Sequence, residues 1–174
     1  AGPVAAPSAN RSGHVSPTTA AHVAADLGHK VACILDAGAA EIGLESTVVG
    51  LAGGEAVILR PGAIARADIE HVLGRTLATP ADPGKVSAPG MLASHYAPNA
   101  ALRLDATEVT PGDALLAFGS TLPSGADRAI AIQNLSKSGD LGEAASNLFA
   151  ALRYLDGQAA AIAGLVRSVP SRIA

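Results

Sequence analysis

The sequence predicts an α/β protein made of two unequal parts, and three features of the chain indicate this class. In the first part, two aliphatic runs flank Gly53 and Gly54, which is a hairpin pattern. In the last part, short apolar runs alternate with an amphipathic helical pattern over residues 141–155, as in small α/β units. Six prolines and glycines fall between residues 79 and 98. We therefore place a linker at residues 79–99, between a first domain at 1–78 and a second at 100–174.

The first part begins with a short extended run that ends in a polar loop. Ser16 and Pro17 have the residue types of an N-cap and a first helical position, which predicts a helix that continues through residues 20–27. The apolar run 32–35 predicts a buried strand, and Cys33 within it reads as a buried structural thiol.

The remaining elements follow from the same periodicities. Residues 45–49 and 56–59 are the two strands of the expected hairpin, and a short helix follows at 67–73. After the linker, four short apolar runs are strand candidates, with the long helix before the last of them: 102–104, 114–118, 129–132 and 159–165.

Composition excludes several classes of function. The chain has 174 residues, of which 49% are hydrophobic, and a net charge of -3 that gives no strong global attraction to nucleic acid. Aromatic residues make up only 2%, which disfavours base stacking on exposed rings. A lone cysteine allows no intrachain disulfide. With no apolar run of membrane-spanning length and no signal-peptide pattern, we expect a cytoplasmic protein.

Hydroxyl-rich motifs are the most informative part of the sequence. Residues 7–13 and the following Ser16 place three serines and an asparagine around an expected helix start, where backbone N–H groups favour an anion such as a nucleotide phosphate. The alternative is a capped helix after a polar turn. Ser46 and Thr47 stand at the mouth of a strand, and Arg60 ends the next one before a proline. Arg60 could pair with a phosphate or could be an ordinary surface arginine.

Other titratable residues give weaker signals. The five histidines show no metal-ligand spacing, so no metal site is expected. Asp36 and Glu45 could be paired acids, but solvated loop acids are the commoner case. The turn at residues 118–120 could bind an anion, although a plain strand exit accounts for it equally well.

Four motifs in order resemble one family: PSANRSG with SPT after it, then GLESTVV, LRPGAI and PGMLASHYAP. They are similar to motifs of the threonylcarbamoyl-AMP synthases, YrdC-like enzymes, in their longer two-domain form. The resemblance is dense over residues 3–98 and loose beyond. It implies that the first domain is the C-terminal half of a YrdC-like twisted mixed sheet and that the second is a small Rossmann-like domain.

The resemblance also implies residue roles, matched motif by motif. The residues expected to contact ATP are Ser8, Asn10, Ser16, Arg60 and Tyr96. L-threonine is expected at Ala6 and Ser46. No catalytic side chain and no protein metal ligand are implied, and Mg²⁺ is expected to accompany ATP. Without the family, an ordinary linker aromatic would be the better interpretation of Tyr96.

The implied function is L-threonylcarbamoyladenylate synthesis from L-threonine, bicarbonate and ATP, with the product passed to a tRNA threonylcarbamoyl transferase. The basic Lys-Arg cluster of the family's N-terminal half does not occur in these residues. We therefore expect a fragment cut at both ends, or a damaged gene product, that is inactive by itself. One alternative is a non-catalytic YrdC-like module that contacts tRNA or another RNA. Another is the carbamoyl-adenylate domain of hydrogenase maturation proteins, which the HYAP linker and the following α/β unit disfavour.

Overall fold

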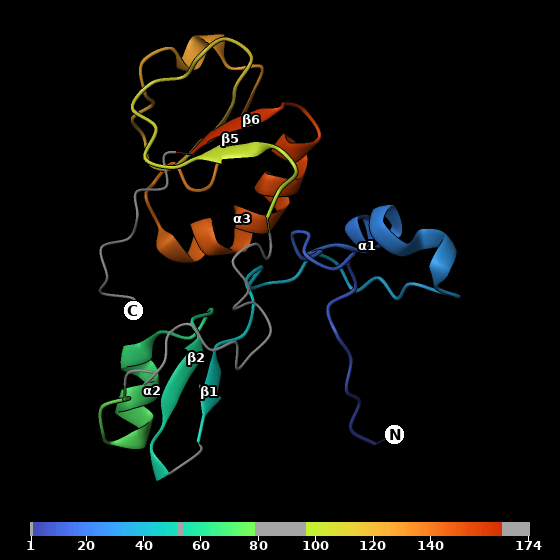
Figure 1. Cartoon of the computed structure of the whole chain (residues 1–174), viewed down its shortest axis with the longest axis vertical. Helices are drawn as coiled ribbons and strands as arrows, with labels where there is room; N and C mark the ends of the chain where they lie inside the picture. The colour runs from blue at the N-terminus through green and yellow to red at the C-terminus, as the bar shows by residue number, and fades with distance from the viewer. Residues whose placement is uncertain (1, 52–53, 79–96, 165–174) are drawn as a thin grey trace.

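The computed structural model of the chain describes residues 2–51, 54–78 and 97–164 (Figure 1). Helices and strands alternate along these segments, so the α/β class predicted from the sequence is confirmed. The elements are, in chain order, α1 Ala20–Leu27, η1 Gly28–Lys30, β1 Val48–Gly50, β2 Val57–Arg60, α2 Arg66–Leu73, β3 Ala101–Arg103, β4 Ala114–Ala117, η3 Ala126–Arg128, β5 Ala131–Asn134, α3 Leu141–Asp156 and β6 Ala161–Gly164.

The first part of the chain contains the expected hairpin. Strands β1 and β2 pair antiparallel, with Val48 opposite Arg60 and Gly50 opposite Val57. Helix α2 lies beside them (Figure 1). Ala78 adds one parallel bridge to Val57, so the pairing around β2 is mixed. The register matters for the site because it places Arg60 at the end of the hairpin where the chain enters β1.

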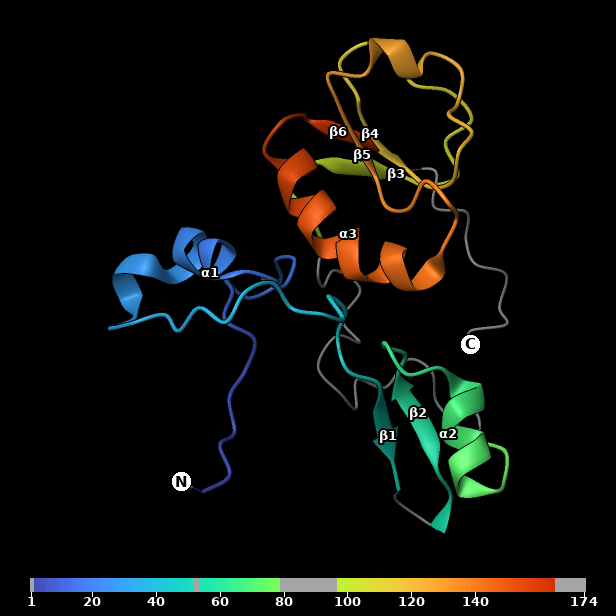
Figure 2. The same cartoon turned by 180° about the vertical axis from the view of Figure 1, so that it is seen from behind.

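The second part is a parallel sheet with the strand order β3-β6-β4-β5. Helix α3 covers one face, and the loops around η3 cover the other (Figures 1 and 2). Strand β4 is buried at all four positions, because both of its faces are covered. Leu115 and Leu116 accordingly lie in two different apolar clusters, one on each side of the sheet. The interpretation of residues 100–174 as a separate domain stays a prediction.

The larger apolar cluster lies between the sheet and α3, and it extends beyond the second part of the chain. Leu155 of α3 and Ile162 of β6 are fully buried in it. Val15, from the loop before α1, belongs to the same cluster and is 3% exposed. Leu44, from the loop before β1, packs against it. Two segments of the first part are therefore anchored in the core of the second.

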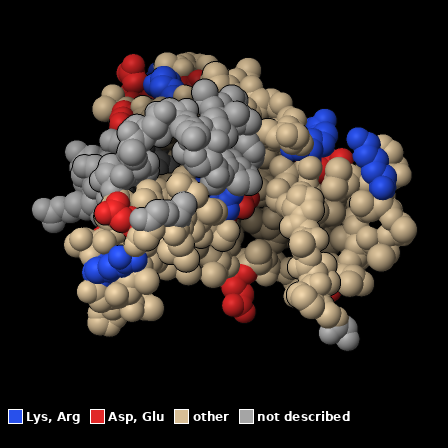
Figure 3. Space-filling model, turned by 60° about the horizontal axis from the view of Figure 1, so that its bottom comes forward, with Lys and Arg blue, Asp and Glu red and all other residues tan. Residues whose placement is uncertain are grey.

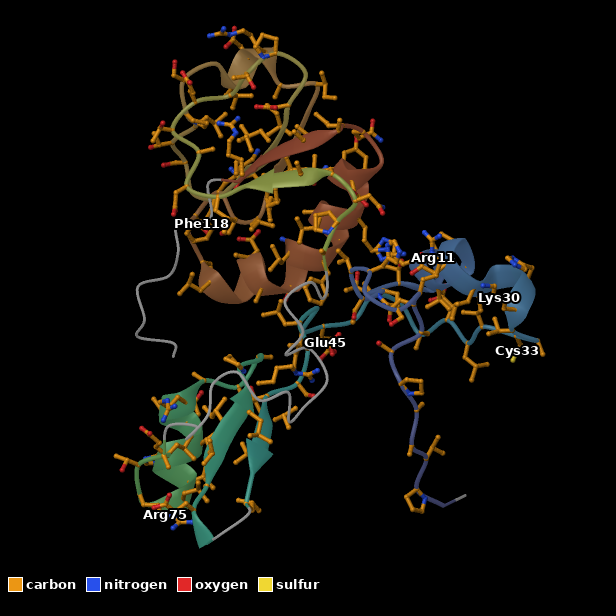
Figure 4. All side chains as sticks on the ribbon, in the orientation of Figure 1. Arg11, Lys30, Cys33, Glu45, Arg75 and Phe118 are labelled. Atoms are coloured by element: carbon orange, nitrogen blue, oxygen red, sulfur yellow. The ribbon has the colours of Figure 1, made fainter. Side chains whose placement is uncertain are left out.

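Two expectations from the sequence were wrong. Helix α1 begins at Ala20 rather than at Pro17, because Thr19 is the N-cap and its Oγ1 accepts the His22 N–H at 3.2 Å. Residues 32–35 form no strand, and Cys33 is exposed (Figure 4). A strand requires a neighbour for its backbone N–H and C=O groups, and no described segment lies in register with this one.

His22 closes the turn before α1. Its Nδ1 accepts the Thr18 N–H at 3.2 Å, and the Thr18 Oγ1 lies 3.3 Å from the same nitrogen. Burial lowers the pKa of His22 below its usual 6.5, and the Arg153 guanidinium lowers it further, while Asp26 acts in the opposite direction. The folded state therefore favours the neutral form of the His22 ring.

None of the described helices has the length and apolarity needed to span a bilayer.

We expect the turn at Thr18 to make folding stability depend on pH. Because the pKa of His22 is lowered on folding, the unfolded chain takes up the proton first as the pH falls. The stabilisation is complete above pH 6.5 and decreases as the pH falls from 6.5 towards the lower pKa of the folded state. Thermal unfolding of wild type and His22→Gln, followed by circular dichroism from pH 8 to pH 5, measures this effect.

The His22→Gln variant should show a flatter pH profile, and the exposed His29 provides the matched control variant His29→Gln. At pH 8 the loss of the Thr18 contact should cost about 1 kcal/mol. Equal slopes for wild type and His22→Gln between pH 6.5 and pH 5 would contradict this prediction.

Candidate functional site

Arg60 is held against Ser46 at the end of the hairpin. Its Nε donates to the Ser46 backbone oxygen at 3.1 Å, and its Nη2 donates to the same oxygen at 2.9 Å and to Ser46 Oγ at 3.0 Å. The Arg60 side chain is only 12% exposed. Gly62 permits this approach, since a Cβ there would lie 2.4 Å from Thr47 N and 2.5 Å from Glu45 O. Any larger residue at position 62 would push the two segments apart.

Glu45 connects Ser16 to Arg60. Ser16 Oγ donates to Glu45 Oε1, and Arg60 Nη2 lies 3.7 Å from Glu45 Oε2. Ser16 is 6% exposed and the Glu45 side chain is 23% exposed, so the group is largely shielded from water. We call Ser16, Glu45, Ser46 and Arg60 the Glu45 cluster. Glu45 lies where the N-terminal loop, the hairpin and the C-terminal unit (residues 97–164) meet (Figure 4).

The cluster brings together three of the residues predicted from the sequence. Ser16 is 29 positions from Glu45, and Ser46 is 14 positions from Arg60, so only folding brings them together. Hydroxyl groups and a guanidinium are the donors that proteins use for phosphate or carboxylate groups. Here they are engaged by the Glu45 carboxylate and the Ser46 oxygens, and their assigned roles in ligand binding stay predictions.

Ser8 and Ala6 lie outside this cluster. Both are exposed, on the extended segment that leads away from the loop at Asn10 towards the N-terminus (Figure 1). Among the described residues, the structure records no hydrogen bond from Ser8 to a partner. No strand among the described residues pairs with this segment, so no strand pairing directs these side chains towards Arg60. Their contacts with ATP and L-threonine stay predictions, and Tyr96 lies outside the described residues.

Asn10 closes the loop before Ser16. Its Nδ2 donates to the backbone oxygens of Arg11 and His14, each at 3.0 Å. Its Oδ1 is buried and has no hydrogen-bond partner among the described residues. Gly13, with a φ of 83°, makes the turn within this loop. Asn10 thus shapes the loop, and its buried oxygen is an acceptor available to a ligand or a water molecule.

Sequence reasoning missed the role of Glu45. The alternatives considered for it were a pair with Asp36 and a solvated loop acid. Asp36 instead accepts the Gly38 N–H at 2.9 Å in an exposed loop. The signal for Glu45 was its place directly before Ser46 in the GLESTVV motif, since a residue bonded to a motif serine is carried into the same region of the fold.

The other sequence candidates are accounted for locally. Gly119 has a φ of 84° and donates to Ser136 O at 2.7 Å, while Asn134 Nδ2 donates to Gly119 O at 2.9 Å. The turn after Phe118 is thus a strand exit held by internal bonds (Figure 4). In the described parts of the chain, no group of three or more His, Cys, Asp or Glu residues could hold a metal ion.

A cleft of about 230 Å³ lies between the N-terminal loop, α1 and the C-terminal unit. It contains cationic and anionic side chains together, so it has no strong preference for one sign of charge. None of the four cluster residues lines it. Its lining residues are Arg11, His14, Val15, Asp26, Ala97, Asn99, Arg153, Asp156 and Gly157.

The visible charge distribution gives no support to a nucleic-acid surface. On the face drawn in Figure 3, Lys and Arg side chains stand singly and are interspersed with Asp and Glu. An RNA-binding face is expected to gather cations in one patch or stripe. The described part of this face shows no such stripe.

Comparison with protein families identifies both parts of the chain. A family model described as "Threonylcarbamoyl-AMP synthase, C-terminal domain" matches residues 64–172. A second model, described as "Telomere recombination", matches residues 1–62. The threonylcarbamoyl-AMP synthase of Pyrococcus abyssi is 50% identical over 102 residues, which cover 56% of this chain and 30% of that protein. The Bacillus subtilis enzyme is 47% identical over 108 residues, with coverages of 59% and 30%.

Solved structures agree with the sequence relatives. The crystal structure of P. abyssi Sua5 complexed with L-threonine matches with a TM-score of 0.73 at 34% identity, over 91% of this chain and 51% of that one. A variant form of the same protein gives a TM-score of 0.68. The chain spans about 30% of the length of the two curated relatives above. From the matched models and the motifs that meet at Glu45, we conclude that the chain belongs to the threonylcarbamoyl-AMP synthase family.

Proposed function

We propose that this chain provides one side of the substrate pocket of an L-threonylcarbamoyladenylate synthase. The observation that carries the proposal is the Glu45 cluster, in which Ser16, Ser46 and Arg60 converge from three family motifs. The reaction consumes L-threonine, bicarbonate and ATP and yields threonylcarbamoyl-AMP and pyrophosphate. A relative of known structure was solved with L-threonine, which supports this substrate for the present chain.

The chemistry requires positioning and charge balance rather than a nucleophilic side chain. The amine of threonine takes up carbon dioxide derived from bicarbonate and becomes a carbamate. A carbamate oxygen then forms a bond to the α-phosphorus of ATP, and the bond to the leaving pyrophosphate breaks. Arg60 would offset phosphate charge, and Ser16 would orient the nucleotide. Ser46, held by Arg60, would contact L-threonine, and Ala6 and Ser8 would join the pocket from the N-terminal segment.

In the absence of an anionic ligand, the Glu45 carboxylate partly balances the charge of the Arg60 guanidinium. A bound phosphate would compete with this carboxylate for Arg60. Both oxygens of Glu45 face partners in the cluster, so the described residues offer no metal cage here. We propose that Mg²⁺ arrives on the phosphates of ATP, since this ion is commonly held by substrate phosphates and few carboxylates.

The remaining parts of the proposal concern partners and location. The product would pass to a tRNA threonylcarbamoyl transferase in the cytoplasm, where tRNA itself would be a further partner. The non-catalytic RNA-binding alternative is not favoured by the relatives, which are named as synthases. We propose that the chain alone turns its substrates over too slowly to detect, because these residues include no basic cluster to balance the developing charge.

Replacing Arg60 by alanine should weaken ATP binding. Loss of a charge-assisted contact to phosphate is worth about 1.5–3 kcal/mol, which corresponds to a dissociation constant about 10- to 150-fold higher. Isothermal titration calorimetry of ATP with L-threonine present measures this change. The matched control is Arg75→Ala, because Arg75 is an exposed arginine at the far end of the hairpin unit (Figure 4).

Unchanged affinity in Arg60→Ala, with circular dichroism like that of wild type, would remove the main support for the site. A titration with tRNA separates the two functions. Binding of ATP and L-threonine supports the synthase, whereas binding of tRNA alone supports the RNA module.

Replacing Glu45 by glutamine should strengthen ATP binding. Glutamine keeps an acceptor for Ser16 Oγ but removes the charge that competes with phosphate for Arg60. A partly exposed ion pair is worth up to about 1 kcal/mol, so the affinity should rise by up to about fivefold. The gain should shrink in 0.5 M salt, where the charges are screened. A weaker affinity than that of wild type would show that Glu45 serves the ligand rather than Arg60.

A further inference from the structure

Arg153 of α3 reaches from the C-terminal unit into the segment that carries Ser16. Its Nη1 donates to the backbone oxygen of Val15, and its Nη2 donates to His22 O at 3.2 Å and to Asp26 Oδ1 at 2.7 Å. The Arg153 side chain is 14% exposed and that of Asp26 is 9% exposed. This planar group therefore fixes the residue directly before Ser16 and the body of α1 at the same time.

The same helix also contacts the segment that carries Glu45. Ser146 Oγ donates to Glu41 O at 2.7 Å. Gly43 lies directly on the α3 backbone, since a Cβ at this position would be 2.3 Å from Ser146 O. Gly43 also has a φ of 60°, which glycine adopts without strain. Contact this close is possible only because residue 43 has no side chain.

Two apolar residues also attach these segments to the core under α3, and each of them directly precedes a residue of the Glu45 cluster. Val15 is buried in the core under α3 and precedes Ser16, while Leu44 packs on that core and precedes Glu45. Ser16 and Glu45, the residues that directly follow Val15 and Leu44, bond to each other. Anchoring Val15 and Leu44 at the core therefore places the two bonded residues. The backbone bond from Ala40 N to Thr18 O, at 2.8 Å, joins the two segments again.

We infer that α3 of the C-terminal unit positions the Glu45 cluster, with Arg153 and Gly43 as positioning residues. The C-terminal unit therefore sets the geometry of the Glu45 cluster, although it contributes no residue to that cluster. The placement of the two segments stands on the contacts above, and only its consequence for ATP binding rests on the proposed function. Neither residue belongs to the cluster itself.

Hydrogen exchange followed by mass spectrometry tests the role of Arg153 on the whole chain. In Arg153→Gln, peptides covering residues 14–23 and 40–47 should exchange about tenfold faster, while those covering β4 and β5 keep their wild-type rates. Arg153→Lys keeps the charge but loses the two-pronged geometry, so it should give a partial effect. The matched control is Arg128→Gln, at an exposed arginine in η3 on the opposite side of the sheet.

A second comparison tests the close approach of Gly43 to α3. Gly38 also has a positive φ, 92°, but a Cβ there would meet no atom within 4 Å. Gly43→Ala and Gly38→Ala therefore both place a side chain at a positive φ, and only Gly43→Ala adds a clash with Ser146. Exchange at residues 40–47 should rise clearly more in Gly43→Ala than in Gly38→Ala.

Three outcomes decide the inference. Wild-type exchange at 14–23 in Arg153→Gln, or equal effects of the two glycine variants, would overturn it. Faster exchange spread equally over β4 and β5 would also overturn it, because Arg153 would then serve general stability. Weaker ATP binding in Arg153→Gln, by several fold, would extend the effect to the pocket. If the wild-type chain binds no ATP, the proposed function fails while the exchange result still decides the placement.

Discussion

The shared carboxylate of Glu45 is the interaction on which the candidate site depends. It accepts from Ser16 on one side and faces Arg60 on the other, so it joins two segments between which the described structure shows no strand pairing. A guanidinium shielded from water needs an opposite charge or hydrogen-bond acceptors. Glu45 and the Ser46 oxygens supply both, and Arg60 is therefore held in place before any anionic ligand arrives.

This arrangement explains why the C-terminal unit matters to a site that lies outside it. The hairpin and α2 are small, and none of their helical or strand residues reaches full burial in the described structure. More buried apolar residues lie in the core under α3, where Val15 is buried and against which Leu44 packs. Because this core is rigid and Ser16 and Glu45 are the next residues along the chain, their positions are restricted as well.

The sequence predicted the regular elements well wherever local patterns and tertiary packing agree. The hairpin, α2, α3 and the strands of the parallel sheet appear within one to three residues of their expected bounds. The start of α1 was wrong because Ser16, the expected cap, bonds to Glu45 instead, which leaves Thr19 to cap the helix. The strand expected at 32–35 was wrong because a strand exists only through its neighbour, and local hydrophobicity does not supply one.

The sequence by itself determined the α/β class, the family motifs and the kinds of groups available to the site, because these follow from residue type and spacing. Only the tertiary structure decided that Glu45 links Ser16 to Arg60, that Arg153 holds Val15, and that Ser8 and Ala6 lie apart from them. Contacts between segments this far apart along the chain depend on the packing of both segments on α3. No local pattern of residue types in the sequence indicates this packing.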